Sequence, residues 1–269
     1  MDLIDLAPNH KLGLTVSSPL LLSPTAAGFG DLLPRGVEAA KLGAVVVGPV
    51  SAAGRGYGGP STLVEIDGGV LVQESGFSRS ARRAVERYDA AWARLGCPVI
   101  VQLVDADPAD LARSARQLLR ASSVAGVEWC TPANATPALV ADGVRALAQV
   151  LDAPLWVKLP LEKAVALAER ATAAGAAALV IGQAPRGAAA RLEPVSPAGA
   201  PAVMTGALYG PATFPLMLHT LHDVATLSLG CALIACGGVH TAAHIRQALA
   251  AGAHAVQIDT LLWSEPGLI

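Results

Sequence analysis

Several features that would indicate particular classes of protein are scarce in this sequence. Only 15% of the 269 residues are charged, 4% are aromatic, and the formal net charge is −2. Proteins that neutralise nucleic-acid phosphates carry a basic excess, so we expect no nucleic-acid partner. Every apolar run is interrupted before the roughly 20 residues that a membrane-spanning helix requires, so we expect no membrane span.

The cysteines are few and show no metal-binding spacing. The chain has four, Cys97, Cys130, Cys231 and Cys236, and no pair forms a zinc-finger or Cys-x-x-Cys motif. All except Cys130 lie in or beside apolar runs, which predicts buried thiols in a reducing environment. Residues 1–13 contain acidic residues and no apolar core of a signal peptide. We therefore expect a cytoplasmic protein without a metal centre.

The chain instead alternates short apolar runs with longer helical patterns. Eight runs have the length and the continuous apolarity of parallel strands that are covered on both faces. They span residues 19–26, 43–50, 97–105, 126–132, 154–160, 178–183, 232–239 and 255–262. Helical spacing lies between most of them, and Asp107 before Pro108 predicts an N-cap with proline at the first helical position. Eight strands and seven crossovers favour an α/β fold, a single TIM (β/α)8 barrel over residues 1–269.

Two insertions and one missing element interrupt this pattern. Residues 51–78 predict a glycine-rich loop and a β-hairpin after the second strand, and residues 184–209 predict a long loop after the sixth. Both follow strand ends at the C-terminal face, where barrel active sites form; surface insertion without function is the alternative. No helical pattern follows the last strand. We therefore predict that a homodimer contact or a rearranged loop covers that flank.

A glycine pair, Gly237 and Gly238, closes the seventh strand where a helix begins near Thr241. Glycines let an anion approach the backbone closely, and a helix N-terminus favours negative charge. In barrels the loops after strands seven and eight often bind phosphate, and the Thr260 hydroxyl at the end of the eighth strand can donate. These residues predict a ligand that carries a phosphate; glycine as simple turn punctuation is the alternative.

Six segments, in the same order, resemble the dihydroorotate dehydrogenase family of FMN-dependent barrels. They are "LGLTVSSPLLLSPTAAG" for its opening hairpin and first strand, "RGYGGPSTLVEIDGG" for its second loop and hairpin, "GVEWCTPANATP" in place of its Asn-x-Ser-(Cys/Ser)-Pro-Asn signature, "PLWVKLP" for its Val-Lys-Leu strand, "TGALYGP" for its Gly-Gly-Leu-Ser-Gly loop, and "GGV" followed by "AGAHAVQIDT" for its phosphate segment. The resemblance implies an N-terminal β-hairpin before the barrel, FMN as cofactor, and hydride transfer between flavin N5 and a small substrate. It leaves the second electron acceptor unknown.

The resemblance also implies which residues bind the cofactor. Lys158 would lie near the N1/O2 edge of the flavin, where a cation stabilises the reduced anionic ring. The other implied residues are Ala26, Ala27 and Gly28 against the flavin, Gln102 and Gln183 beside the ring, Gly210, Gly237, Gly238 and Thr260 around the phosphate, and Asp259, which replaces a glycine of the family at that end.

The substrate half departs from the family pattern at Glu128, Cys130 and Thr131. The catalytic-base position is Thr131, and a threonine cannot remove a proton near pH 7 without help. Cys130 could do so as a thiolate, but strand alternation prevents these two neighbours from both facing the flavin. Glu128 could be a general base or an anchor for a cationic or N–H-bearing substrate. It could instead pair with an arginine of the loops above the site: Arg55, Arg79 or Arg186.

These departures leave the substrate and even the reaction open. The family's orotate-binding lysine and one of its asparagines correspond to Gly48 and Ala133 here, so the substrate need not be dihydroorotate. One alternative is a non-redox barrel enzyme that binds a phosphorylated metabolite, in which Lys158 could form a Schiff base. Another is a flavin-binding protein that has lost catalysis.

Overall fold

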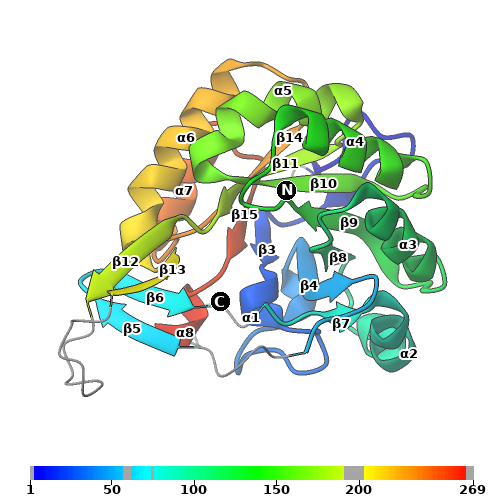
Figure 1. Cartoon of the computed structure of the whole chain (residues 1–269), viewed down its shortest axis with the longest axis horizontal. Helices are drawn as coiled ribbons and strands as arrows, with labels where there is room; N and C mark the ends of the chain where they lie inside the picture. Colours follow the sequence, from blue (N-terminus) through cyan, green and yellow to red (C-terminus); the bar gives the residue numbers. More distant parts are fainter. Residues whose placement is uncertain (1–2, 57–61, 74–75, 191–202, 265–269) are drawn as a thin grey trace.

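Eight parallel strands form a closed barrel in the computed structural model, which describes residues 3–56, 62–73, 76–190 and 203–264 (Figure 1). Each strand pairs with the next around the ring, and a pairing between the first and second strands closes it. In ring order the strands are β3 (Leu20–Leu22), β15 (Ala255–Ile258), β14 (Ala232–Cys236), β11 (Ala178–Gln183), β10 (Leu155–Pro160), β9 (Val124–Cys130), β8 (Val99–Leu103) and β4 (Ala44–Ser51). The predicted (β/α)8 barrel is confirmed.

Helices cover the outside of the barrel (Figure 1). The longer ones are α2 (Ala81–Trp92), α3 (Pro108–Leu118), α4 (Pro137–Ala148), α5 (Ala164–Ala174), α6 (Phe214–Thr226) and α7 (Ala242–Ala250). The predicted cap is confirmed, because the Asp107 carboxylate accepts hydrogen bonds from the backbone N–H groups of Ala109 at 2.8 Å and Asp110 at 3.3 Å. Such a cap stabilises a helix by about 1 kcal/mol.

The first and last barrel strands are followed by one turn of helix each. These are α1 (Pro24–Ala27) and α8 (Leu261–Ser264), and three 3₁₀ turns occur at η1 (Ala39–Lys41), η2 (Leu161–Lys163) and η3 (Pro211–Thr213). A full helix is therefore lacking after β15 within the described residues. Residues 265–269 lie outside them.

The two insertions join each other in a four-stranded antiparallel sheet. The hairpin β5 (Thr62–Ile66) and β6 (Gly69–Gln73) was predicted. The segment predicted as a long loop, 184–209, instead contains β12 (Arg186–Ala190) and β13 (Val203–Tyr209), and β13 pairs with β6. The loop prediction was wrong because partners distant in the chain stabilise these two strands. In Figure 1 the sheet projects from one side of the barrel.

Alternation along the strands divides the core into two clusters. Trp156 and Ile234 belong to the cluster inside the barrel, whereas their neighbours Val157 and Leu233 pack between the strands and the helices. Successive strand residues point to opposite faces, and burying one such side chain contributes about 1.5–3 kcal/mol. The N-terminal hairpin of β1 (Ile4–Asp5) and β2 (Thr15–Val16) packs against the inner cluster through residues such as Val16.

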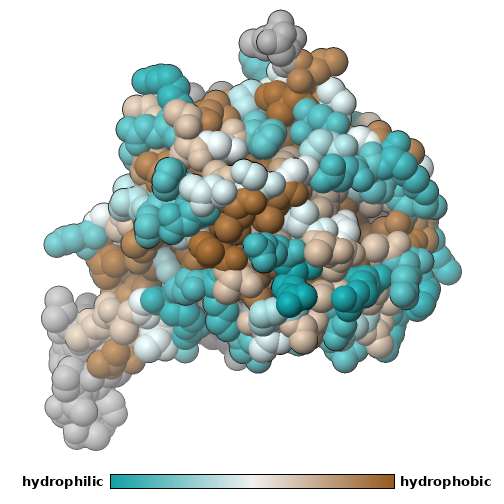
Figure 2. Space-filling model, turned by 90° about the horizontal axis from the view of Figure 1, so that it is seen from above, coloured by the Kyte–Doolittle hydropathy of each residue, from teal (hydrophilic) through white to brown (hydrophobic). Residues whose placement is uncertain are grey.

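One short strand, β7 (Arg79–Ser80), extends the barrel sheet beside β4 and leads into α2. Seen from above in Figure 2, the surface is a mosaic in which polar and apolar residues are interspersed. No helix among the described residues is both long enough and apolar enough to cross a membrane.

Candidate active site

A cavity of about 690 Å³ opens over the C-terminal ends of the barrel strands. Its floor includes Gln102 at the end of β8, Cys130 at the end of β9, Lys158 in β10 and Gln183 at the end of β11. Asp259, directly after β15, also lines it. The volume lies within the range of about 300–1,000 Å³ that is typical of small-molecule and cofactor sites. The expectation that a site forms at this face agrees with the geometry.

Four polar side chains form a network inside the barrel, two of them in the cavity floor and two beneath it. Glu128 is completely buried and accepts hydrogen bonds at both carboxylate oxygens, from Gln102 Nε2 at 2.7 Å and from Gln257 Nε2 at 2.5 Å. Gln257 Oε1 in turn accepts from Lys158 Nζ at 3.0 Å. The Lys158 ammonium lies 3.7 Å from Glu128 Oε1. The network therefore links β8, β9, β10 and β15 around a single buried ion pair.

The surroundings of Lys158 keep its side chain charged. Burial by itself would lower the pKa of Lys158, but Cys236, Glu128, Cys130 and Asp259 together outweigh it and raise the pKa above its ordinary value. Burial also raises the pKa of the Cys236 thiol to about 11, so this thiol is neutral near pH 7. The carboxylates therefore carry the stabilisation of the ammonium at neutral pH.

The two neighbours proposed for proton transfer have different surroundings. The Thr131 hydroxyl is buried and donates to the Lys158 carbonyl oxygen at 2.9 Å, so it is engaged with the backbone. The Cys130 thiol lines the cavity and lies 3.4 Å from Gln183 Nε2. As alternation along β9 required, one of the two side chains reaches the cavity and its neighbour does not.

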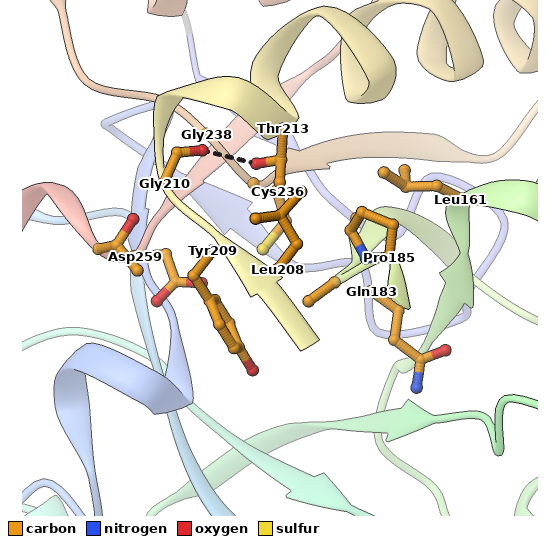
Figure 3. A pocket seen from close by; sticks show the side chains of 14 residues that line it. Leu161, Gln183, Pro185, Leu208, Tyr209, Gly210, Thr213, Cys236, Gly238 and Asp259 are labelled. Atoms are coloured by element: carbon orange, nitrogen blue, oxygen red, sulfur yellow. Dashed lines mark hydrogen bonds between the residues drawn. The ribbon is translucent and has the colours of Figure 1, made fainter. Parts of the chain in front are cut away.

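A second, small cavity lies at the predicted phosphate end (Figure 3). It encloses about 10 Å³, which is room for about one water molecule. Its lining brings together all five residues predicted for that end: Gly210, Gly237, Gly238, Asp259 and Thr260. The two cavities share Gln183, Tyr209 and Asp259 among their lining residues, so they adjoin each other.

Gly238 has a steric reason to be glycine. Its φ is +69°, and a Cβ there would lie 2.2 Å from the backbone nitrogen of Phe214, the first residue of α6. Any side chain would therefore displace the start of α6. At Gly237, with φ +114°, the nearest atom to such a Cβ is Thr213 Oγ1 at 3.7 Å, so the backbone there is open to close approach. In Figure 3 the Thr213 hydroxyl donates to the Gly210 carbonyl beside this pair, at 2.9 Å.

The three residues expected against the flavin at the end of the first strand line neither of the two cavities. Ala26 and Ala27 belong to helix α1, and Gly28 caps it; Pro24 and Thr25 line the larger cavity instead. Ala27 packs into the apolar core.

Two of the three candidate arginines line the larger cavity, and the third packs against aromatic rings. Arg55 and Arg186 line the larger cavity. The guanidinium of Arg79 lies over the rings of Phe29 at 5.0 Å and Tyr88 at 5.5 Å. Pairing of Glu128 with an arginine was one of the alternatives that the sequence left open; its ion-pair partner in the structure is Lys158.

Sequence reasoning missed Gln257, although it is the centre of the network. Its signal was a polar residue inside the apolar run "AVQID", two positions before Asp259 and so on the same face of the strand. It also missed Lys163 and Tyr209, which line the larger cavity. Tyr209 lies on β13 of the inserted sheet, and Lys163 lies in η2, the 3₁₀ turn after β10.

Comparison with known proteins identifies the family. The profile of the family described as dihydroorotate dehydrogenase matches residues 8–268. The chain belongs to the dihydroorotate dehydrogenase family. Its members are FMN-dependent oxidoreductases of pyrimidine biosynthesis. The resemblance inferred from the sequence is confirmed.

The curated relatives share modest identity with this dihydroorotate dehydrogenase-like chain over nearly its full length. The catalytic subunits of dihydroorotate dehydrogenase B (NAD(+)) from Bacillus thuringiensis (strain Al Hakam) and Bacillus cereus (strain B4264) are each 24% identical over 267 residues, covering 94% of this chain and 85% of the relative. The ligand-free dihydroorotate dehydrogenase of Eimeria tenella has a TM-score of 0.73 at 18% identity, covering 97% of this chain and 83% of that chain. This structural likeness supports the barrel fold.

Among the described residues, no group of three or more histidine, cysteine, aspartate or glutamate side chains could hold a metal ion. None of the four cysteines forms a disulfide bond.

Proposed function

We propose that this protein is an FMN-dependent oxidoreductase that moves a hydride between flavin N5 and a CH–CH bond of a small substrate. The observation that carries the proposal is the buried ammonium of Lys158 at the floor of the 690 Å³ cavity. When bound, FMN supplies the hydride acceptor and donor. Lys158 supplies a fixed positive charge, which stabilises the reduced anionic ring.

The residues present fit FMN at its ring end. The cavity is large enough, and the Gln183 side-chain oxygen Oε1 is buried with no hydrogen-bond partner among the described residues. A buried acceptor of this kind is costly unless a ligand donates to it, and a flavin or a ring-shaped substrate carries N–H donors.

The phosphate end fits less well than the ring end: its residue types suit an anion with one exception, but the small cavity encloses only about 10 Å³, so its lining would have to open to admit a phosphate. The glycine backbone and Thr260 suit an anion, but the carboxylate of Asp259 lines the same small cavity. Two like charges disfavour each other in a buried site, so Asp259 weakens phosphate binding unless its side chain turns away. This part of the site determines how tightly FMN is held, whereas the ring end determines the chemistry.

We assign proton transfer to Cys130. It lines the cavity, whereas Thr131 is bonded to the backbone and Glu128 lies below the floor. Cys130 and Lys158 are paired in register on neighbouring strands, and a nearby cation favours the thiolate that would remove a proton. Arg55 and Arg186 would bind an anionic group of the substrate.

The raised pKa of Lys158 counts against the non-redox alternative. Schiff-base formation requires a neutral amine, and a lysine that pairs with Glu128 is protonated near pH 7. A flavin-binding protein without catalysis remains the second candidate, because the predicted orotate-binding residues are replaced in this chain.

The experiment is a visible spectrum of the purified protein, followed by anaerobic addition of dihydroorotate and then of other small unsaturated or saturable ring compounds. We expect flavin absorbance, FMN as the released cofactor, and bleaching by at least one compound. Dithionite serves as the control that the bound flavin can be reduced. Absence of flavin after incubation with FMN would favour the non-redox alternative, and flavin that only dithionite reduces would favour lost catalysis.

We also propose a cytoplasmic location and a homodimer. Cysteines that form no disulfide bonds are typical of reducing compartments. The flank after β15 carries only the four-residue helix α8 among the described residues, and a second copy could cover it. Size-exclusion chromatography with light scattering tests the dimer; a monomer at all concentrations would contradict it.

A further inference from the structure

We infer that Glu128 is a positioning residue which, through Gln257 and Lys158, sets the charge beside the cofactor ring and lowers the reduction potential of bound FMN. The inference rests on the proposed function. Glu128 itself lies beneath the cavity floor and is completely buried. Of the residues in its network, Lys158 and Gln102 line the cavity.

The direction of the hydrogen bonds shows how Glu128 orders the network. An ionised carboxylate can only accept hydrogen bonds, so both neighbouring amides must turn their NH₂ groups toward it. Gln257 consequently turns its oxygen toward Lys158 Nζ, at 3.0 Å. A neutral amide at position 128 would not impose these orientations, because one of its ends would donate.

Charge is the second part of the argument. The Glu128 carboxylate and the Lys158 ammonium are 3.7 Å apart, and their side chains are 0% and 8% exposed. Interactions between charges are stronger in such low-dielectric surroundings than in water. The other titratable groups that act on Lys158 are Cys130, Cys236 and Asp259. Two amide donors fix the position of Glu128.

The pair presents a partly compensated cation to the cavity. A bare ammonium would favour the reduced anionic flavin strongly and raise its potential. A carboxylate close behind the ammonium offsets part of this effect. Glu128 thus holds Lys158 protonated and at the same time lowers the positive potential that the ring experiences.

The test is the midpoint potential of FMN bound to the Glu128→Gln holoprotein, measured by dye-equilibrated anaerobic reduction at about pH 6, where a lysine amine is protonated. We expect the equilibrium to shift toward reduced flavin by at least about tenfold, which is a rise of about 30 mV for a two-electron couple. A rise that fades as the pH increases would show that the uncompensated ammonium causes it. An unchanged or lower potential at about pH 6 would overturn the inference.

A double-variant comparison separates action through Lys158 from general damage. In a Lys158→Met background, Glu128→Gln should raise the potential much less, because the carboxylate no longer has an ammonium to offset. An equal rise in both backgrounds would contradict a route through Lys158.

Asp105→Asn is the matched control. Asp105 is also a buried carboxylate, held by the backbone N–H of Ala52 at 3.1 Å and the Ser114 hydroxyl at 2.6 Å, but it does not line either cavity. This variant should lose stability and keep the wild-type potential. A shift equal to that of Glu128→Gln would identify loss of any buried carboxylate as the cause and overturn the inference.

If Glu128→Gln is not recovered as folded holoprotein, Glu128→Asp replaces it. The shorter side chain keeps the charge but withdraws it from Lys158, so the expected shift has the same sign, and absence of a shift contradicts the inference. Failure of the wild-type protein to bind FMN would instead refute the proposed function, and the two failures are therefore distinguishable.

Discussion

Gln257 donates a hydrogen bond to Glu128 at 2.5 Å although the two residues are 129 positions apart in the chain. The bond spans the barrel interior from β15 to β9, which are not neighbours in the ring of strands. It completes the support of a buried carboxylate that lies 3.7 Å from the Lys158 ammonium. The geometry of the cavity floor consequently depends on a contact between the fourth and the eighth strand of the barrel.

The first prediction concerns this contact. Gln257→Leu removes a donor to Glu128 and the acceptor of Lys158. Leaving buried polar groups without partners costs about 1–3 kcal/mol, so the free energy of unfolding in urea should fall by about that amount. Gln149→Leu, at an exposed position that caps α4 through its backbone, should change it by less than about 0.5 kcal/mol. Equal effects of the two substitutions would contradict the network.

The second prediction separates Cys130 from Thr131. Cys130→Ala should slow flavin reduction by the substrate at least about 100-fold, which is the usual contribution of a general base. Thr131→Val loses one buried hydrogen bond to the Lys158 carbonyl and about 1 kcal/mol of stability, but its reduction rate should stay within the same order of magnitude. Anaerobic stopped-flow absorbance measures both rates. A larger loss in Thr131→Val would assign the proton transfer to Thr131.

The third prediction concerns the carboxylate at the phosphate end. Asp259→Gly removes a negative charge from the small cavity, so FMN should bind at least about tenfold more tightly, a gain of about 1.4 kcal/mol. Riboflavin lacks the phosphate and is the matched control ligand; its affinity should change little. Fluorescence titration of the apoprotein measures both. Similar gains for both ligands would show that Asp259 acts on the ring.

The fourth prediction is a loss of stability at alkaline pH. Burial raises the pKa of the Cys236 thiol from 9.0 to about 11, so the unfolded chain loses its proton at a lower pH than the folded protein. The stabilisation is therefore complete below about pH 9 and decreases as the pH rises to about 11. The difference of about two pH units corresponds to about 3 kcal/mol for a fully buried group.

Cys97, whose pKa burial also raises to about 11, and Lys158, whose pKa is raised, change stability in the same direction. Urea unfolding at a series of pH values measures the decrease, and Cys236→Ala should show a smaller one. A decrease of the same size in Cys236→Ala would contradict the assignment to this thiol.

Much of the fold could be predicted from the sequence because barrel strands are local signals. Parallel strands covered on both faces are continuous apolar runs, and each of the eight predicted runs overlaps a barrel strand. The strands β12 and β13 could not be predicted, because "RGAAA" has no alternation of apolar and polar residues. β12 pairs with β13, and β13 pairs with β6, which lies more than a hundred residues away in the chain.

The site was predictable where a residue type itself carries the chemistry. Lys158, Gln102 and Gln183, which the resemblance implied beside the flavin, line the larger cavity, and so does Cys130, which the sequence offered as an alternative to Thr131. The partners of Glu128 were not predictable. The sequence does not tell which face of the last strand points into the barrel, nor which side chains meet there once the barrel closes. The position of Ala26 and Ala27 depended on the one-turn helix α1, which is too short to leave a periodic signal.

The most direct test of the whole account is an equilibrium titration of the apoprotein with FMN, followed by flavin fluorescence, for the wild-type protein and for Lys158→Met. The account predicts saturable binding of one FMN per chain, and a clearly weaker affinity when the ammonium at the cavity floor is removed. Wild-type protein that shows no saturation below about 1 mM FMN, or a Lys158→Met variant that binds FMN as tightly as the wild type, would contradict it.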